Sequence, residues 1–579
     1  MFIHSFFVDR NAAINESSKK NNLRYFLLFM NAILILAFVF RTYFTIHTTD
    51  EVFNIEQAFR TVQGNAYLVE NWEFYQTGDS FLYPFLKIFY MITGSTEGIV
   101  FYTRTIFLII QGLFVLAGYK LLSSKFDKTS ALFACIIYVS AVSLKIFNMW
   151  YDTWEMLFRA LGCLLILYVV TNSAALSRRC ALGLLAAAGI CHACMVYAYP
   201  TMIIVYVFVL IMLFRSEKKR VIPYLAGSIA VLAVFMIYAL SVGVGHLFVF
   251  SGVLSQHGLD STGRSGLFDI SRMGSLAVSL VVDNIEVYRS ALVILAADAG
   301  LFFLARRNSK YKLPFVFLMV IGAVVHLVEN AFTMETGNTV LTYLSFYAPM
   351  LYFLISKESR EKYKGAFSFI FASSYVAAAA YAFTALYGST KTSSGARFAA
   401  ILTLILVWDV IRENVKKIEP ESVYSIVVTI LLFANVFSLY YSASAGTEYK
   451  GTRPLDCDTV VKEGIFKGLI DSKETVDKYV QIERDIRSSV SEDDETVTCS
   501  LYVIYGYLMA DLKPDTYNLW DSIYFNRLSE YYQANYGNPD IIIFDSRYVE
   551  YMDAGFKEFI IDNYELLRSS GDIRIYHCK

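Results

Sequence analysis

Long apolar runs separated by short polar connections dominate the chain between residues 25 and 441. A run of about 20 apolar residues can cross a bilayer as a helix. The runs that predict spans are 25–46, 99–121, 129–147, 156–171, 181–198, 200–214, 223–245, 287–305, 313–329, 341–356, 366–387, 397–411 and 422–441. We therefore expect a polytopic α-helical membrane protein with about 13 transmembrane helices. Tyr199 and Pro200 interrupt residues 181–214, which predicts a hairpin of two helices there.

Composition supports this class. The 579 residues are 56% hydrophobic and 17% charged, whereas soluble domains are about 25% charged. The formal net charge of -1 hides a patterned distribution and argues neither for nor against a nucleic-acid partner. Nothing in the sequence resembles the footprint of a nucleic-acid-binding protein, so no such partner is expected.

Basic residues recur in every second connection, which predicts that these connections are cytoplasmic. They lie within 19–24, 125–128, 178–179, 215–220, 306–312, 357–364 and 412–417. The long connections 47–98 and 246–286 then lie on the extracytoplasmic side of the membrane. We accordingly expect a cytoplasmic tail over 1–24, a transmembrane domain over 25–441 and an extracytoplasmic domain over 442–579.

The C-terminal segment alternates helical and strand-like patterns, which predicts a small α/β domain. Helices are expected near 459–489, 522–535 and 555–569, and strands at 496–503, 540–544 and 572–576. The segment has no Gly-rich phosphate loop and no nucleophile constellation. Binding, positioning or assembly therefore suits this domain better than chemistry.

Polar residues concentrate in the first outer loop, where Thr48 and Glu51 have the spacing of a capping box. The pattern over 52–63 predicts an amphipathic helix lying on the membrane surface. Asp50 would lie in its first turn, where the helix dipole favours negative charge. A carboxylate at this boundary could act as a general base on a lipid-linked substrate. The alternative is a capped surface helix with ordinary first-turn acids.

The same loop carries side chains that suit a sugar, because hydroxyls need acceptors and sugar faces stack on aromatic rings. Trp72, Glu73, Tyr75 and Gln76 are the candidate substrate-binding residues there. A second interfacial helix is expected over 81–92, and Arg104 follows near the outer end of the second span.

The order of these motifs resembles the first outer loop of the GT-C glycosyltransferases, in particular the protein O-mannosyltransferase and aminoarabinose transferase branch. The motifs are Asp-Glu after the first span, a helix ending in Gly-Asn, a Tyr-Pro-x-Leu-like helix, a Gly-Ser-x-Glu turn and an Arg opening the next span. The Lys-Pro-Pro-Leu and Arg-Tyr-x-x-Pro motifs of the aminoarabinose branch are absent. The motif resemblance covers roughly residues 25–170.

The resemblance implies that a sugar is transferred from a polyprenyl-phosphate donor to an extracytoplasmic glycan, lipid or protein acceptor, with inversion. It implies that Asp50 is the base and that Asp152, before the fourth predicted span, is a second catalytic acid. Their neighbours Glu51 and Tyr151 are then expected to contact the substrate. The cell membrane of a bacterium is the expected location.

The leaving phosphate requires cationic or polar donors. Candidates are Arg104, Lys145, Arg159, Arg264 and Arg272. For Arg159, phosphate binding and pairing with Asp152 or Glu155 are equally open; for Lys145, snorkelling or pairing is favoured.

No cofactor is expected. Asp50, Glu51 and Asp152 could gather around a divalent cation, but the absence of a dense carboxylate cluster disfavours a metal. The alternative function is a transporter or flippase of lipid-linked glycans, which would place paired polar residues deep in the membrane. A third possibility is an assembly or sensor protein anchored by the spans.

Overall fold

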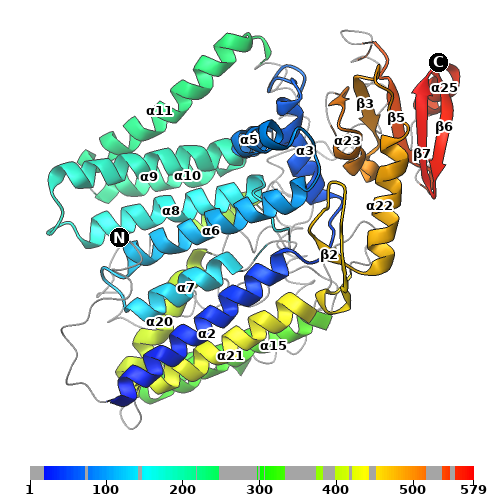
Figure 1. The fold of residues 1–579 in the computed structure, drawn as a ribbon. Helices are drawn as coiled ribbons and strands as arrows, with labels where there is room; N and C mark the ends of the chain where they lie inside the picture. Colours follow the sequence, from blue (N-terminus) through cyan, green and yellow to red (C-terminus); the bar gives the residue numbers. More distant parts are fainter. Residues whose placement is uncertain are drawn as a thin grey trace.

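The computed structural model is mostly helical, and its long helices between Ser18 and Tyr441 pack together in one bundle (Figure 1). It describes residues 18–71, 76–140, 142, 146–216, 218–246, 296–297, 300–305, 307–332, 373–381, 398–415, 420–441, 452–516, 519, 532, 537–547 and 554–579. The predicted long loop 246–286 and the predicted helix 522–535 therefore lie almost wholly outside the described residues.

The bundle is built from long apolar helices joined by short turns. The helices are α2 (Ser18–Thr42), α6 (Ile99–Leu122), α7 (Lys128–Ser140), α8 (Tyr151–Thr171), α9 (Arg178–Ala198), α10 (Ile203–Ser216), α11 (Lys218–Val242), α15 (Lys312–Phe332), α20 (Phe398–Asn414) and α21 (Pro420–Tyr441). Among the described residues, five helices are long and apolar enough to cross a membrane, namely α6, α8, α9, α11 and residues 422–441 of α21. The molecule thus has the character of a helical membrane protein.

Two sequence expectations for the bundle can be compared directly with the structure. The predicted hairpin over 181–214 is confirmed, because α9 ends at Ala198 and the turn η2 (Pro200–Met202) leads into α10. The predicted span 129–147 is too long: α7 ends at Ser140, and residues 146–150 are buried but non-helical. This non-helical stretch carries Asn148, whose side chain donates a hydrogen bond to the backbone carbonyl of Glu51.

Glycines allow α9 and α11 to pack closely. A Cβ added at Gly189 would overlap the carbonyl oxygen of Tyr224, and one added at Gly227 would overlap that of Ala186. Small residues of this kind let helix backbones approach in membranes, where dispersion contacts drive association.

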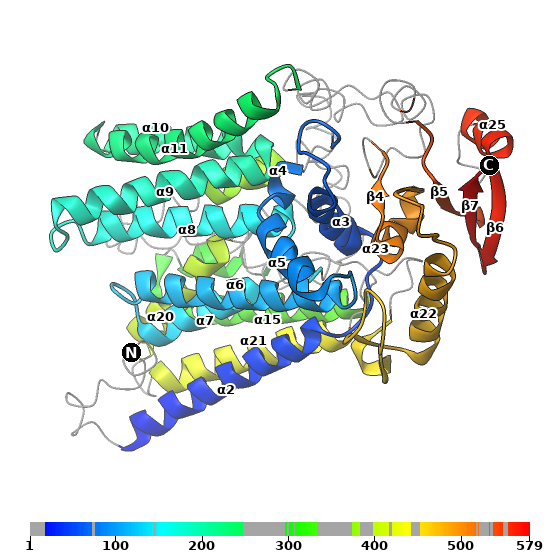
Figure 2. The same cartoon turned by 45° about the horizontal axis from the view of Figure 1, so that its top comes forward.

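Three short helices in the connection between α2 and α6 lie at the end of the bundle nearest the C-terminal domain (Figure 2). They are α3 (Asp50–Val62), α4 (Gln76–Asp79) and α5 (Tyr83–Thr93). Pro84 stands in the first turn of α5, and Gly94 ends the helix in a left-handed conformation. Gly78 in α4 lies so close to α8 that an added Cβ would be 2.5 Å from the Cβ of Tyr151.

The C-terminal region contains a five-stranded sheet of order β4-β3-β5-β7-β6. Its strands are β3 (Thr496–Cys499), β4 (Lys513–Pro514), β5 (Ile541–Asp545), β6 (Tyr564–Ser570) and β7 (Ile573–Cys578). Its helices are α22 (Lys473–Arg487), the 3-10 turn η5 (Leu501–Val503), α23 (Tyr505–Ala510) and α25 (Ala554–Asn563). Within β5, Ile542 and Phe544 pack with α25, whereas Ile541 and Ile543 join the main core on the other face.

Two helix predictions in this region are wrong at one end. Residues Thr459–Val460 and Ile470–Asp471 form the antiparallel strands β1 and β2, because Gly464 and Gly468 take positive φ angles that a helix cannot continue through. Residues 564–569 form strand β6, because the turn at Gly571 folds the chain back and pairs β6 with β7.

Candidate functional site

The candidate site lies where α3 begins, directly after the first bundle helix. Helix α3 starts at Asp50, as the sequence predicts, but Thr49 occupies the N-cap position and its side chain makes no capping hydrogen bond. The capping-box prediction is therefore wrong. Glu51 turns away from the helix end because it forms an ion pair, and the buried hydroxyl of Thr48 has no hydrogen-bond partner among the described residues.

Arg104, near the start of α6, forms a bidentate ion pair with Glu51. Its Nε lies 2.8 Å from Oε1 of Glu51, and its Nη2 lies 2.6 Å from Oε2. The remaining N–H groups donate to the backbone carbonyls of Thr42, Phe44 and Thr45. Both side chains are almost fully buried. All five guanidinium donors are thus used within the chain, which favours a positioning role for Arg104 over phosphate binding.

Asp50 differs sharply from its neighbour. Its side chain is half-buried, and within the described parts of the chain its carboxylate has no hydrogen bond or ion pair. Only its backbone carbonyl is engaged, by the side chain of Asn54. A partly accessible carboxylate at a helix N-terminus can accept a proton from a hydroxyl that approaches it.

His47 completes the surroundings of Asp50, and the sequence analysis did not identify it. Its Nδ1 accepts a hydrogen bond from the backbone N–H of Glu51, at 3.4 Å. Burial lowers the pKa of His47, so the ring is neutral at neutral pH. His47 could have been identified from its position three residues before Asp50, because a residue at that position adjoins the first turn of the helix.

A second polar group lies at the start of α8. Asp152 is fully buried and faces the hydroxyl of Tyr381, which lies 3.5 Å from its Oδ1. The same hydroxyl donates to Glu155 at 2.7 Å, and Arg159 pairs with Glu155 at 2.6 Å. Of the two alternatives for Arg159, the structure shows the ion pair with Glu155.

Asn148 connects these two groups. Its Nδ2 donates to the backbone carbonyl of Glu51 at 3.3 Å. The backbone carbonyl of Asn148 accepts a hydrogen bond from the hydroxyl of Thr153 at 3.1 Å. The turn before Asp152 is therefore joined to the first turn of α3. The sequence analysis did not identify Asn148 as a site residue, because an amide that bonds to backbone carbonyls leaves no pattern in a sequence.

The other predicted residues divide into two sets. Tyr151 is buried, with its ring 5.8 Å from that of Tyr199. Gln76 is the first residue of α4. The predictions for Trp72, Glu73, Tyr75, Lys145, Arg264 and Arg272 lie outside the described residues.

The expected exposed polar face of α3 is covered by the C-terminal domain, which corrects the picture of a helix resting on the membrane surface alone. Arg60 donates to the carbonyl of Thr516 at 2.6 Å, and Gln63 donates to that of Leu512 at 3.0 Å. Helix α23 also packs against α3. Every residue from Glu51 to Arg60 is consequently buried.

Glu56 is the unusual member of this covered face. It is fully buried, and its two carboxylate oxygens have no hydrogen-bond partner among the described residues. Burial raises the pKa of Glu56 well above its ordinary value, against the opposing effect of Arg60. Burial therefore favours the neutral form of this carboxyl group in the folded protein.

Within the described residues there is no group of three or more side chains suited to holding a metal ion. Comparison with protein-family models and with curated proteins finds no match for this sequence. The fold and site define a helical membrane protein in which a half-buried carboxylate begins a short helix that packs against the C-terminal sheet domain.

Proposed function

We propose that the protein is a GT-C-like glycosyltransferase that moves a sugar from a polyprenyl-phosphate donor to an extracytoplasmic acceptor, with Asp50 as general base. The observation that carries this proposal is the contrast between two adjacent acids. Glu51 is held by Arg104, whereas Asp50 presents a half-buried carboxylate at the end of an apolar bundle. A base for a lipid-linked substrate must be both positioned and accessible in this way.

In the proposed topology, about 13 spans cross the cell membrane and α3 lies outside. The described basic connections support this orientation, because they fall at the turns between α6 and α7, α8 and α9, and α10 and α11. These turns lie at the end of the bundle opposite α3 and the C-terminal domain (Figure 2). Basic residues mark cytoplasmic connections in multi-span proteins.

In the proposed reaction, Asp50 takes the proton of an acceptor hydroxyl while that oxygen attacks the anomeric carbon of the donor. The bond from that carbon to the phosphate oxygen breaks, and polyprenyl phosphate leaves from the opposite face, so the configuration inverts. The substrate would also contact residues of the first outer loop, including Trp72, Glu73, Tyr75 and Gln76. Because Arg104 and Arg159 are both paired, Arg264, Arg272 and Lys145 are the remaining candidates for phosphate binding.

Release of polyprenyl phosphate tests the proposal. Purified protein in lipid nanodiscs would receive a panel of radiolabelled polyprenyl-phosphate sugars and an acceptor extract. Asp50→Asn should lower turnover by about 10²–10⁴-fold, the usual effect of losing a general base, without changing the unfolding temperature. Glu97→Gln is a matched control in the same loop, since its exposed pairing with Lys467 contributes little.

Two outcomes would contradict the proposal. Transfer that survives in Asp50→Asn would remove Asp50 from the mechanism. Failure of every donor would favour the transporter alternative, for which the buried Glu155–Arg159 pair is the supporting observation. In that case, substitution of Glu155 should abolish lipid-linked glycan transport in vesicles, and Asp50→Asn should leave it intact.

A further inference from the structure

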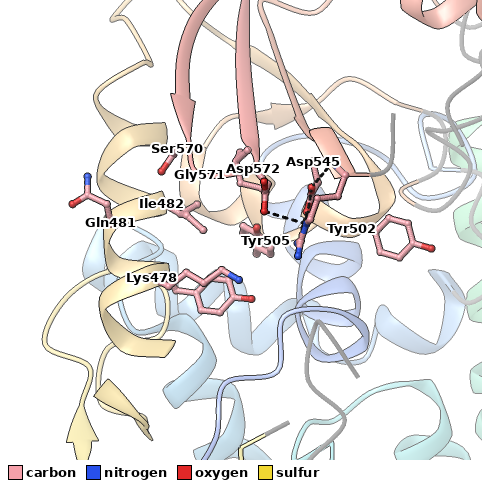
Figure 3. A pocket seen from close by; sticks show the side chains of 12 residues that line it. Lys478, Gln481, Ile482, Tyr502, Tyr505, Asp545, Ser570, Gly571 and Asp572 are labelled. Atoms are coloured by element: carbon pink, nitrogen blue, oxygen red, sulfur yellow. Dashed lines mark hydrogen bonds and ion pairs between the residues drawn. The ribbon is translucent and has the colours of Figure 1, made fainter. Parts of the chain in front are cut away.

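A pocket of about 220 Å³ opens in the C-terminal domain, between α22 and the strands β5, β6 and β7 (Figure 3). Lys478 and Tyr479 line it from α22, Tyr502 lines it from the turn η5, and Tyr505 lines it from the start of α23. Its volume is below the ~300–1,000 Å³ typical of sites for drug-sized ligands. The pocket therefore suits a ligand of about one ring.

A guanidinium and two carboxylates form the polar wall of this pocket. Arg547 pairs with Asp545, with Nη2 2.6 Å from Oδ2, and its Nε lies 3.4 Å from Oδ2 of Asp572. Asp545 is almost fully buried, while Arg547 and Asp572 are 40% and 56% exposed. The buried acid thus fixes the cation in place, and Asp572 keeps accessible acceptor oxygens at the rim.

Tyrosines form the other walls. Tyr479 and Tyr505 are buried, and their ring centroids are 5.5 Å apart. Tyr502 lies on the opposite side of the two carboxylates from Lys478 (Figure 3). Aromatic rings with polar tips contact the apolar faces of a sugar while neighbouring groups bond to its hydroxyls.

The charges of the pocket select against ionic ligands. Lys478 and Arg547 balance Asp545 and Asp572, so neither an anion nor a cation meets an uncompensated opposite charge. A neutral molecule rich in hydroxyl groups can use both kinds of partner at once, because hydroxyls donate to carboxylates and accept from cations.

We infer that this pocket binds one neutral sugar residue of the acceptor, so that the acceptor of the proposed transferase is a glycan. The identification of this sugar as part of the acceptor rests on the proposed function. The binding of a neutral sugar to the pocket can be tested by itself. The pocket is also connected to the proposed base. Tyr505 is the first residue of α23, and α23 packs against α3, which begins with Asp50.

The test uses full-length protein in nanodiscs and saturation-transfer NMR with neutral hexose oligosaccharides. Two further arms use an acidic uronic-acid oligosaccharide and inorganic phosphate. We expect binding of a neutral oligosaccharide that weakens at least about tenfold in Tyr502→Ala and in Asp572→Asn. Asp477→Asn on α22 is the matched control, because this exposed acid pairs with Lys473 and does not line the pocket.

Binding of no neutral sugar, equal binding in both pocket variants, or preferential binding of the acidic sugar or phosphate would each overturn the inference. Asp50→Asn should bind the neutral sugar as the unmodified protein does, which separates this test from the test of transfer. If transfer is established, Tyr502→Ala should raise the KM for the acceptor with little change in kcat. An unchanged KM would also contradict the inference.

Discussion

Arg104 forms a bidentate ion pair with Glu51 through two N–H···O hydrogen bonds of 2.8 and 2.6 Å. The preceding residue, Asp50, takes no part in this ion pair. Two neighbouring acids with the same chemistry therefore have different surroundings. The buried ion pair fixes the first turn of α3, and the half-buried carboxylate beside it stays partly accessible.

Breaking the Arg104–Glu51 pair should destabilise the protein strongly. Arg104→Met leaves Glu51 buried without a counter-charge, a change that typically costs about 3–5 kcal/mol. The double variant Arg104→Met/Glu51→Gln should regain part of this loss, because no charge then remains buried. Denaturant unfolding of the protein in detergent, monitored by intrinsic fluorescence, would measure both. Strictly additive effects of the two substitutions would contradict the role assigned to the pair.

The interface between α3 and the C-terminal domain should weaken as the pH rises. Burial raises the pKa of Glu56 well above its usual range, that of Asp511 to about 6 and that of Asp515 to about 7. Groups facing Glu56 include Arg60, which lowers its pKa, and Asp511, which raises it. A raised folded-state pKa of an acid gives stability that is full below the unfolded pKa and is lost as the pH rises through the folded value.

Unfolding temperature measured between about pH 4.5 and about pH 7 should therefore fall as the pH increases, because in this range the acids are ionised in the unfolded chain and still protonated in the folded protein. Asp515→Asn and Glu56→Gln should each flatten this slope, because the amide does not titrate. Asp477→Asn on the exposed face of α22 should leave the slope unchanged. A slope that is the same in all three variants would exclude these carboxyls as its source.

Packing of α9 against α11 should depend on Gly189. Alanine there would place a Cβ against the carbonyl oxygen of Tyr224, and such overpacking typically costs about 1–3 kcal/mol. Gly183 lies on the same helix with nothing within 4 Å of an added Cβ. Gly183→Ala should therefore be neutral or slightly stabilising, and equal thermal stability of the two variants would refute the close approach of these helices.

The proposed orientation predicts which side of the membrane exposes Cys180. This free, exposed thiol begins α9 beside Arg178 and Arg179. In a variant with the other cysteines replaced by serine, an impermeant maleimide should label it in inside-out vesicles and spare it in intact cells. Ser488→Cys, with Cys180 also replaced, should give the reverse result, because Ser488 follows α22 on the exposed surface of the outer domain. Labelling of Cys180 from outside would invert the proposed topology.

Apolar pattern and turn residues were sufficient to predict much of the helical architecture. The break at Pro200, the start of α3 at Asp50 and the strands β5 and β7 follow from local signals. Strand β6 was missed because its pairing with β7 depends on a tertiary return of the chain, and its exposed Leu566 and Leu567 fit a helix equally well.

The site was only partly predictable for a related reason. Asp50 could be identified from its position at the start of a predicted helix. The ion pair of Glu51 with Arg104 could not be predicted, because the two residues are 53 positions apart in the sequence. The polar side chains of α3 also did not indicate that the C-terminal domain covers them. Arg60 and Gln63 bond to backbone carbonyls of Thr516 and Leu512, and a carbonyl is the same at every residue. A polar helix face looks alike in sequence whether it meets water or a folded domain.

The segment between α2 and α3 is tied to the far end of the chain. The backbone N–H of Thr45 donates to the carbonyl of Ile470 at 2.7 Å, and that of Ile46 donates to Asp471 at 2.6 Å. Residues just before Asp50 thus acquire their final hydrogen bonds only after more than 400 further residues have been synthesised. During translation the segment around Asp50 is among the first to emerge after α2 and among the last to be completed, so a prematurely terminated chain can insert its early helices but leaves the surroundings of Asp50 unfinished.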